Sequence, residues 1–236
     1  MVKPVLPPVY DLVVIAGERD AFTRACELAR SRVRDGLLVW NERPDRLQLA
    51  VLLEPEAGLE ESLQVVPLFT LAVGDALGGF TAPTLPLALR WPATVLIDGV
   101  ELARIRWARG EPPVPGGIPP WIVLGLDAPM REPAEPGRMP DRMTVEGAAG
   151  EPVAATAIVE RIARHFLARV DRWQEEGFAP IARAWNRRLD GRGRITRMEF
   201  GEVEAAGVVE GLDDRGGLRI GGRSLSLLDL PPGAPP

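Results

Sequence analysis

The chain of 236 residues contains one cysteine, one histidine and one lysine. The single cysteine, Cys26, excludes an internal disulfide and a cysteine-based zinc cluster. The single histidine, His165, excludes a histidine-pair metal site and any serine–histidine pair away from residue 165. Because arginine is too basic to exchange protons near pH 7, it cannot replace a missing lysine as a proton carrier. With Lys3 the only lysine, a mechanism that needs a lysine in the core is also excluded.

Long apolar runs and an excess of positive charge are also missing. No run approaches the roughly 20 apolar residues of a membrane-spanning helix, and residues 1–10 lack the regions of a signal peptide. The net charge of −5 argues against a nucleic-acid partner, because phosphate binding needs a basic field. We therefore expect a cytoplasmic protein without nucleic-acid or membrane partners.

The first half of the chain alternates between helix and strand patterns. An apolar stripe predicts a helix after Asp20 that Gly36 ends. Apolar runs around the polar turn "NERPDR" predict a β-hairpin over 36–55. Residues 65–80 are apolar nearly all round and indicate a buried helix. A second hairpin with a turn at Asp98–Gly99 and a buried strand at 121–127 follow.

The second half predicts a long loop over 128–152, a helix that ends at Gly177 and a second helix over 178–189. Short apolar runs separated by glycines then indicate a small β-barrel, with a disordered tail from residue 231. We expect an α+β fold with a mixed, largely antiparallel sheet. The predicted domains are residues 1–190 and a small C-terminal β-barrel domain over 191–236.

The stretch "LRWPATVLIDGVELARIRW" (89–107) has an unusual polar content for a plain hairpin. It resembles the signature hairpin of biotin/lipoate protein ligases, which runs Lys-Trp-Pro-Asn-Asp, strand, turn, Lys-x-Ala-Gly-Ile. "VDRWQEEGFAPIARAW" is similar to the family's helix–glycine–helix passage, and "GVVEGLDDRGGLRI" to the small C-terminal barrel of bacterial biotin ligases. The resemblance covers nearly the whole chain and implies the class II synthetase-like fold of that family.

The resemblance implies a chemistry and a set of site residues. Family members use ATP to activate biotin or lipoate as an acyl-adenylate, and they pass the acyl group to a lysine of a carrier domain. ATP and biotin or lipoate are therefore the implied ligands, a biotinyl or lipoyl carrier domain is the implied partner, and a homodimer is an open alternative. The residues implied to bind ligand are Arg90, Trp91, Pro92, Thr94, Glu101 and Arg104.

The signature is altered at the positions that matter most for adenylation. Ala93 and Thr94 stand where the family has asparagine and aspartate. Glu101 stands where it has the catalytic lysine, and Arg104 where it has glycine. The short turn "NERPDR" leaves no room for the family's glycine- and arginine-rich loop. We therefore expect a ligase-like protein with lost or altered adenylate-forming activity that binds a small acyl or nucleotide ligand or a carrier-like protein.

Two other functions remain open: an active ligase or acyltransferase with a non-standard site, and a non-catalytic regulator or assembly factor. Trp91 is expected either in a ligand pocket or in the core, and Arg90 either at a ligand or in a structural ion pair. An ideal strand places Glu101 and Arg104 on opposite faces, because their spacing is odd. Cys26 is predicted to be a buried small hydrophobe rather than an acyl-transfer nucleophile, and His165 a packing or surface residue rather than a catalyst.

Overall fold

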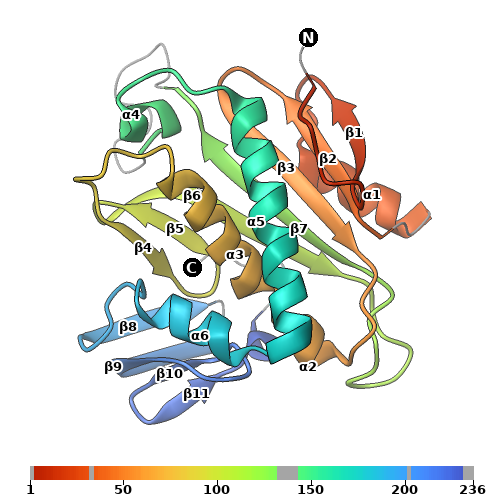
Figure 1. The fold of residues 1–236 in the computed structure, drawn as a ribbon. Coiled ribbons are helices and arrows are strands. Elements are labelled where there is room, and N and C mark those ends of the chain that lie inside the picture. Colours follow the sequence, from red (N-terminus) through yellow and green to blue (C-terminus); the bar gives the residue numbers. More distant parts are fainter. Residues whose placement is uncertain (1–2, 32–34, 132–142, 201–202, 231–236) are drawn as a thin grey trace.

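The computed structural model describes residues 3–31, 35–131, 143–200 and 203–230. Its larger part is a seven-stranded sheet with the order β1-β2-β3-β7-β6-β5-β4 (Figure 1). Strands β1 and β2 are parallel, and every other neighbouring pair is antiparallel. The strands are β1 (Asp11–Ile15), β2 (Leu37–Glu42), β3 (Arg46–Leu53), β4 (Leu87–Arg90), β5 (Thr94–Ile97), β6 (Val100–Arg109) and β7 (Ile122–Pro129). The predicted mixed, largely antiparallel sheet is confirmed.

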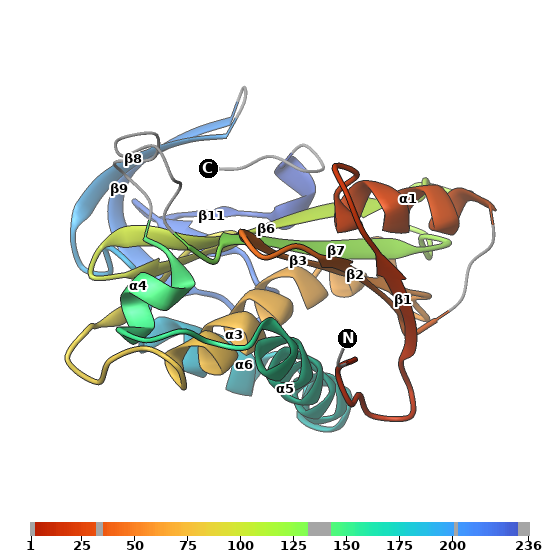
Figure 2. The ribbon, with the colours of Figure 1, turned by 90° about the horizontal axis from the view of Figure 1, so that it is seen from above.

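Helices cover the two faces of this sheet unequally. Helices α3 (Val65–Gly78) and α5 (Ala155–Glu176) lie against one face, and α1 (Ala21–Ser31) covers part of the other (Figure 2). Helix α3 is buried on nearly all sides, as its uniformly apolar sequence predicts. The short helix α2 (Leu59–Ser62) precedes it. Among the described helices, only α1 covers the second face, and polar side chains lie on another part of that face.

The turn between β5 and β6 has the geometry that its sequence predicts. Asp98 and Gly99 both have positive φ, at 50° and 77°, and Ile97 pairs with Val100. Two positive φ values in a two-residue loop match the twist of a β-hairpin, which explains the Asp-Gly pair. The hairpin that carries the altered signature is therefore formed as expected.

The C-terminal part consists of helix α6 and a second sheet. Helix α6 (Ala179–Asn186) follows Gly177, which has a φ of 72° and ends α5 as predicted. The second sheet has the order β11-β10-β9-β8, from β8 (Ile195–Phe200), β9 (Val203–Leu212), β10 (Leu218–Ile220) and β11 (Arg223–Leu225). It is open, with β8 and β11 at its two edges, so the predicted barrel is not confirmed. Strands β10 and β11 have three residues each.

The second sheet packs directly on the signature hairpin. The indole nitrogen of Trp91 donates a hydrogen bond to the carbonyl oxygen of Gly216 at 3.0 Å. The Trp91 ring meets Phe200 edge to face, with 5.4 Å between the ring centroids. Leu89 bonds through its backbone to Arg188 and Asp190, at 2.8 Å each. One hydrophobic cluster therefore runs from the large sheet into the small one.

The predicted loop over 128–152 is wrong at both of its described ends. Strand β7 continues to Pro129, and helix α4 (Val145–Ala149) begins after Thr144, whose hydroxyl accepts a hydrogen bond from the backbone of Gly147. A single cap on a five-residue helix is too weak a pattern to detect in sequence. Residues 132–142 and the tail from 231 lie outside the described residues. Within the described part of the chain, no helix is long and apolar enough to cross a membrane.

Candidate functional site

A row of polar side chains crosses five strands of the large sheet on the face that α1 partly covers. The strand register places these residues directly opposite one another: Thr94 pairs with Arg104, Arg104 with Asp127, Asp127 with Gln48, and Gln48 with Asn41. We call Asn41, Gln48, Asp127, Arg104 and Thr94 the polar row. The residues next to them in sequence, such as Leu47 and Leu49 beside Gln48, belong to the core under α3 and α5. Strand alternation therefore directs the row to the opposite face.

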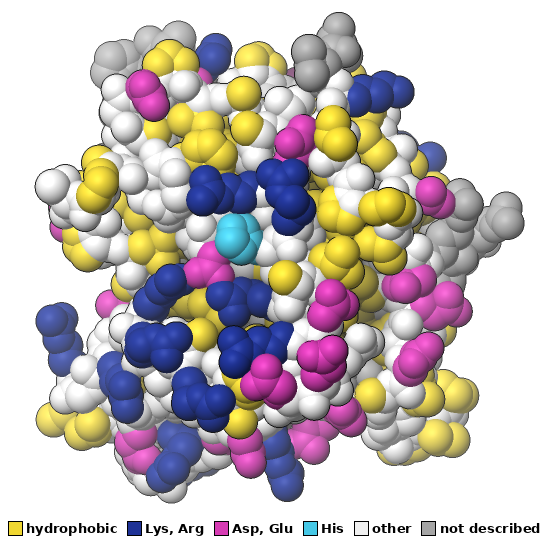
Figure 3. All heavy atoms as spheres, viewed as in Figure 1, with side chains coloured by type: hydrophobic (Ala, Val, Ile, Leu, Met, Phe, Trp, Pro, Cys, Tyr) yellow, Lys and Arg dark blue, Asp and Glu magenta, His cyan; other side chains and the backbone are white. Residues whose placement is uncertain are grey.

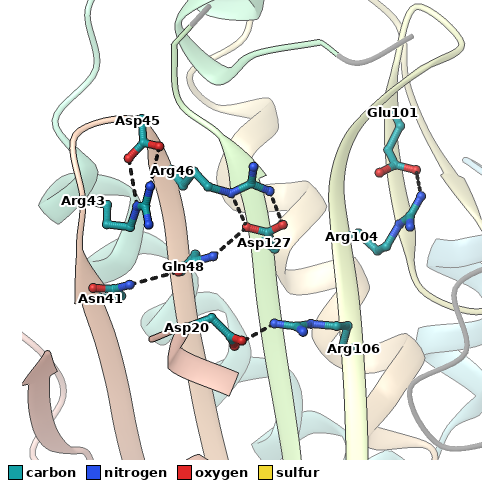
Figure 4. Close-up of polar contacts among 10 residues, drawn as sticks. All are labelled: Asp20, Asn41, Arg43, Asp45, Arg46, Gln48, Glu101, Arg104, Arg106 and Asp127. Atoms are coloured by element: carbon teal, nitrogen blue, oxygen red, sulfur yellow. Dashed lines mark hydrogen bonds and ion pairs between the residues drawn. The ribbon is translucent and has the colours of Figure 1, made fainter. Parts of the chain in front are cut away.

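Side-chain hydrogen bonds join one half of the polar row. The Asn41 amide donates to Gln48 at 3.0 Å, and the Gln48 amide donates to Asp127 at 3.1 Å (Figure 4). Asn41 also donates to the carbonyl oxygens of Gly17 and Arg19, ahead of α1. These bonds satisfy amide groups that burial would otherwise leave without partners.

Each arginine near the polar row contacts a carboxylate of the same chain (Figure 4). Arg46 binds Asp127 through two nitrogens, with Nε at 2.9 Å from Oδ1. Arg106 donates to Asp20 at 2.8 Å and also lies 4.6 Å over the ring of Phe22. In the β2–β3 turn, Arg43 binds Asp45 through two nitrogens at 2.9 and 2.8 Å. The positive charges of this region are therefore largely neutralised internally.

The Glu101–Arg104 pair corrects a prediction from the sequence. Their side chains meet at 2.7 Å on one face of β6, although odd spacing predicts opposite faces. Between Val95 and Leu96 the register slips, so that Leu102 is an extra residue in β6. This β-bulge shifts the alternation by one position and brings Glu101 and Arg104 together.

The predicted site residues fall into three groups. Trp91 is fully buried and Pro92 is buried beside it, so both belong to the core. Arg90 is 41% exposed and pairs with Asp190 at 2.9 Å, which is the structural alternative of the prediction. Thr94 and Arg104 lie in the polar row, and Glu101 adjoins it. The assignment of these residues as ligand-binding remains a prediction.

Two depressions lie on either side of the Glu101–Arg104 pair. One, of about 260 Å³, is lined by Asp20, Gln48, Arg104, Arg106 and Asp127. The other, of about 360 Å³, is lined in part by Arg90, Trp91 and Glu101, with Asp190 and residues of β8 opposite them. Because Arg104 lines the first and Glu101 the second, this ion pair separates them.

Three buried polar atoms of the polar row have no hydrogen-bond partner among the described residues. They are the Asn41 side-chain oxygen, the Thr94 hydroxyl and the Nε of Arg104. Such atoms are rare in native proteins because each costs about 1–3 kcal/mol of desolvation. Thr94 and Arg104 are directly opposite each other, so their two orphaned donors lie at one place in the row.

Ionisation of Asp20 is favoured by its surroundings. Burial opposes the charge, but hydrogen bonds from Thr23 and the nearby Arg106 guanidinium outweigh it and hold the pKa of the Asp20 carboxyl below its ordinary value. The Thr23 backbone donates at 3.0 Å, as expected for a residue that begins α1. Hydrogen bonds to Asp127 raise the pKa of Arg46 despite its burial. Both groups are charged at neutral pH.

Two other residues considered in the sequence lie away from the polar row. Cys26 is 6% exposed in the core beneath α1, and burial raises the pKa of its thiol. A protonated, buried thiol is a poor nucleophile, as expected for a small hydrophobe. His165 is half-buried on α5, at the other face of the sheet. No group of three or more residues that could hold a metal ion occurs in the described ranges.

The sequence prediction missed most of this region. It did not identify Asn41, Gln48, Asp127, Asp20 or Arg106 as neighbours of the hairpin. The available signal is a lone polar residue inside an apolar strand, as in "RLQLAVLL" and "IVLGLDAP". Such a residue marks a solvated or functional face. Only the strand order shows that β2, β3 and β7 bring their polar residues Asn41, Gln48 and Asp127 into one row.

A family profile and a curated relative both link this chain to biotin and lipoate protein ligases. The profile of the biotin/lipoate A/B protein ligase family matches residues 6–187. A biotin–[acetyl-CoA-carboxylase] ligase from Paracoccus denitrificans is 33% identical over 178 residues, which cover 73% of this chain and 72% of that protein.

Solved structures share the fold over almost the full length. A biotin protein ligase-like protein of unknown function from Silicibacter sp. TM1040 is 28% identical, with a TM-score of 0.83 over 95% of this chain and 96% of that chain. The apo biotin protein ligase of Aquifex aeolicus is 19% identical, with a TM-score of 0.74 over 96% of this chain and 94% of that one. The second likeness supports the fold alone.

Proposed function

Because this chain belongs to the biotin/lipoate A/B protein ligase family, we propose that it binds a small acyl ligand on the polar row and does not form acyl-adenylates. The observation that carries this proposal is the internal pairing of Arg43, Arg46, Arg104 and Arg106 with carboxylates. In an adenylate-forming enzyme, cations near the ligand are needed to hold developing negative charge.

The residue at the lysine position argues against adenylation. Glu101 is 14% exposed and stands on β6 where the resemblance implies a lysine. A unit charge 4 Å from an oxyanion contributes about 4 kcal/mol at an effective dielectric of 20. Exchanging lysine for glutamate turns that attraction into repulsion, which the pairing with Arg104 reduces but does not reverse. Lys3 is the only lysine of the chain and precedes β1.

The β2–β3 turn does not fit a triphosphate. Between Glu42 and Arg46 it has three residues, none of them glycine, so it offers no row of exposed backbone amides. Both of its neighbouring arginines are engaged: Arg43 with Asp45, and Arg46 with Asp127. We therefore derive no reaction step that involves ATP.

The polar row has the features of a site for a small carboxylate. The depression of about 260 Å³ lies below the roughly 300–1,000 Å³ of sites for larger ligands. Arg104 lines it, and the orphaned Nε of Arg104 and hydroxyl of Thr94 are both donors. A carboxylate oxygen that displaced Glu101 would bind the terminal nitrogen of Arg104, close to these two donors.

The proposed partner follows from the same family. The name of the Paracoccus relative gives acetyl-CoA carboxylase as the protein on which it acts. We propose a carrier domain of that general kind as a partner that this chain recognises without acylating it. A working ligase with a non-standard site is the alternative outcome of the test below.

Calorimetric titration separates these outcomes. Biotin, lipoate and octanoate are titrated into the protein, followed by ATP and by the three acyl-adenylates. The proposal expects saturable binding of at least one free acid, an Arg104→Gln variant that weakens it, and an adenylate that binds no tighter than its acid. Arg109→Gln, on the same strand, is the matched control. Tight adenylate binding together with acylation of a carrier lysine would establish the working ligase instead.

A further inference from the structure

Arginine side chains gather around His165 on the helical face of the molecule (Figure 3). This face lies on the other side of the sheet from the polar row. A depression of about 370 Å³ is open here and is lined by Phe80, Ala157, Glu160, Arg161, Arg164 and His165. This local concentration of cations is unusual because the chain as a whole has a net charge of −5.

Arg161 is held in a defined position. Its guanidinium lies 5.2 Å over the ring of Phe80 and donates to the carbonyl oxygen of Gly79 at 3.5 Å. A Cβ at residue 79 would overlap this guanidinium, so the glycine makes the space for it. Among the described residues, no carboxylate forms an ion pair with Arg161. Its charge is therefore fixed at the depression without being neutralised.

The carboxylates near the depression are already engaged. Glu160 accepts a hydrogen bond from the backbone of Val5 at 2.8 Å and lies 3.6 Å from Arg164. Asp75, on α3, binds both Arg169 and Arg188. Arg164 is exposed, and its one ion pair with a described residue is the long contact to Glu160. The region around the depression therefore keeps an excess of positive charge.

His165 completes the lining between these groups. It is half-buried, and burial lowers the pKa of its imidazole, with Arg161, Arg169 and Arg164 acting in the same direction against Asp75. Arg161 and Arg164 are like charges three residues apart on one helix, and such a pair carries a small cost in helix stability. An anion that binds between the arginines would remove that cost.

We propose that Arg161, Arg164 and His165 form a binding site for the phosphate group of a small molecule. Two guanidiniums offer several donors in fixed planes, which suits a tetrahedral oxyanion better than a spherical ion. The group can come from free phosphate or from a phosphomonoester, since both present the same oxygens. The site is independent of the acyl ligand proposed for the polar row.

The single histidine makes the test direct, because its imidazole gives the only histidine signals in an NMR spectrum of the full chain. The protein is titrated with inorganic phosphate, glycerol phosphate and AMP at constant ionic strength. The expected result is a saturable shift of the His165 signals and a rise in its pKa, since a bound anion favours the imidazolium. Tighter binding of the esters identifies a phosphomonoester as the source, and tighter binding of phosphate identifies the free ion.

Variants localise the effect. Arg164→Gln changes an exposed residue and is expected to weaken binding at least about tenfold, the loss of one charge-assisted hydrogen bond. Arg161→Gln is expected to do the same. Arg172→Gln, on the same helix and paired with Glu176, leaves binding unchanged. The proposal is overturned if chloride at equal ionic strength gives the same shift, if no shift saturates, or if both Arg161→Gln and Arg164→Gln retain the wild-type affinity.

Discussion

The arginines of the sheet face differ from two arginines of helix α5, Arg161 and Arg164, in what neutralises them. On the sheet face, Arg46, Arg104 and Arg106 each contact a carboxylate of the chain at hydrogen-bond distance. On α5, Arg161 has no ion pair within the described ranges, and Arg164 has one at 3.6 Å. The same residue type is therefore part of a structural network in one region and only weakly paired, or without an ion pair among the described residues, in the other. A paired cation must release its carboxylate before it can bind an anionic ligand, whereas a weakly paired one is directly available.

The largest expected effect comes from breaking the network of the sheet face. Asp127→Asn keeps the shape of the side chain but leaves Arg46, which is 21% exposed, without its charge partner. We expect the free energy of unfolding to fall by about 2 kcal/mol, less than for a fully buried pair. Urea denaturation measures it. Glu199→Gln, in an exposed pair with Arg197, is the control and is expected to change little. Equal losses in both variants would contradict a structural role for the Asp127 pair.

The second prediction concerns Arg104 on the sheet face, which a substitution can release from its carboxylate partner. Glu101→Gln removes the carboxylate that binds Arg104 at 2.7 Å and leaves the guanidinium available. We expect the affinity for the free acid to rise about tenfold, as for one added charge-assisted contact. Calorimetry measures the change, with Glu111→Gln beside Arg109 as the control. Unchanged affinity in Glu101→Gln would place the ligand away from Arg104.

The third prediction concerns acid and Asp20. Because its folded pKa lies below the unfolded value of about 3.9, the ionised carboxylate favours the folded state. This contribution is present above the unfolded pKa and is lost as the pH falls through the folded one. Asp20→Asn keeps a side-chain oxygen that can cap α1 but loses the charge that pairs with Arg106, so we expect it to lose up to about 1 kcal/mol of stability at pH 7. The difference in the free energy of unfolding between Asp20→Asn and the wild type should shrink below about pH 4. A difference that stays constant with pH would contradict a stabilising role for the ionised Asp20 carboxylate.

The smallest effect is expected at the β2–β3 turn. Asp45 is 54% exposed and its bond to Arg43 holds the pKa of its carboxyl below the ordinary value. Asp45→Asn is expected to cost about 0.5 kcal/mol or less, because water screens exposed pairs. Thermal unfolding at low and high salt measures this. A loss as large as that of Asp127→Asn would remove the distinction between the turn and the polar row.

Local patterns of the sequence predict most of the fold. The Asp-Gly turn, the uniformly apolar α3 and Gly177 after α5 each have a direct local cause, and each is found where expected. The bulge at Leu102 depends on pairing with β5, so the alternation of β6 alone predicts the wrong faces for Glu101 and Arg104. The open second sheet depends on which edges meet, which short apolar runs do not specify.

The candidate site is less predictable for the same reason. The altered signature leads to Thr94, Glu101 and Arg104, which are close in sequence. Gln48 and Asp127 are 79 residues apart and meet only because β3 and β7 are neighbours in the sheet. Sequence patterns therefore identify the hairpin, whereas the polar row on which we propose that an acyl ligand binds can be recognised only from the strand order.

Acid-dependent exchange of labelled pyrophosphate into ATP tests the central claim most directly, because it detects formation of an acyl-adenylate without a carrier protein. The account predicts no exchange above background with biotin, lipoate or octanoate, under conditions where calorimetry detects binding of one of these acids. Exchange that depends on one of the acids and disappears in an Arg104→Gln variant would show that the polar row supports adenylation, and would contradict the account.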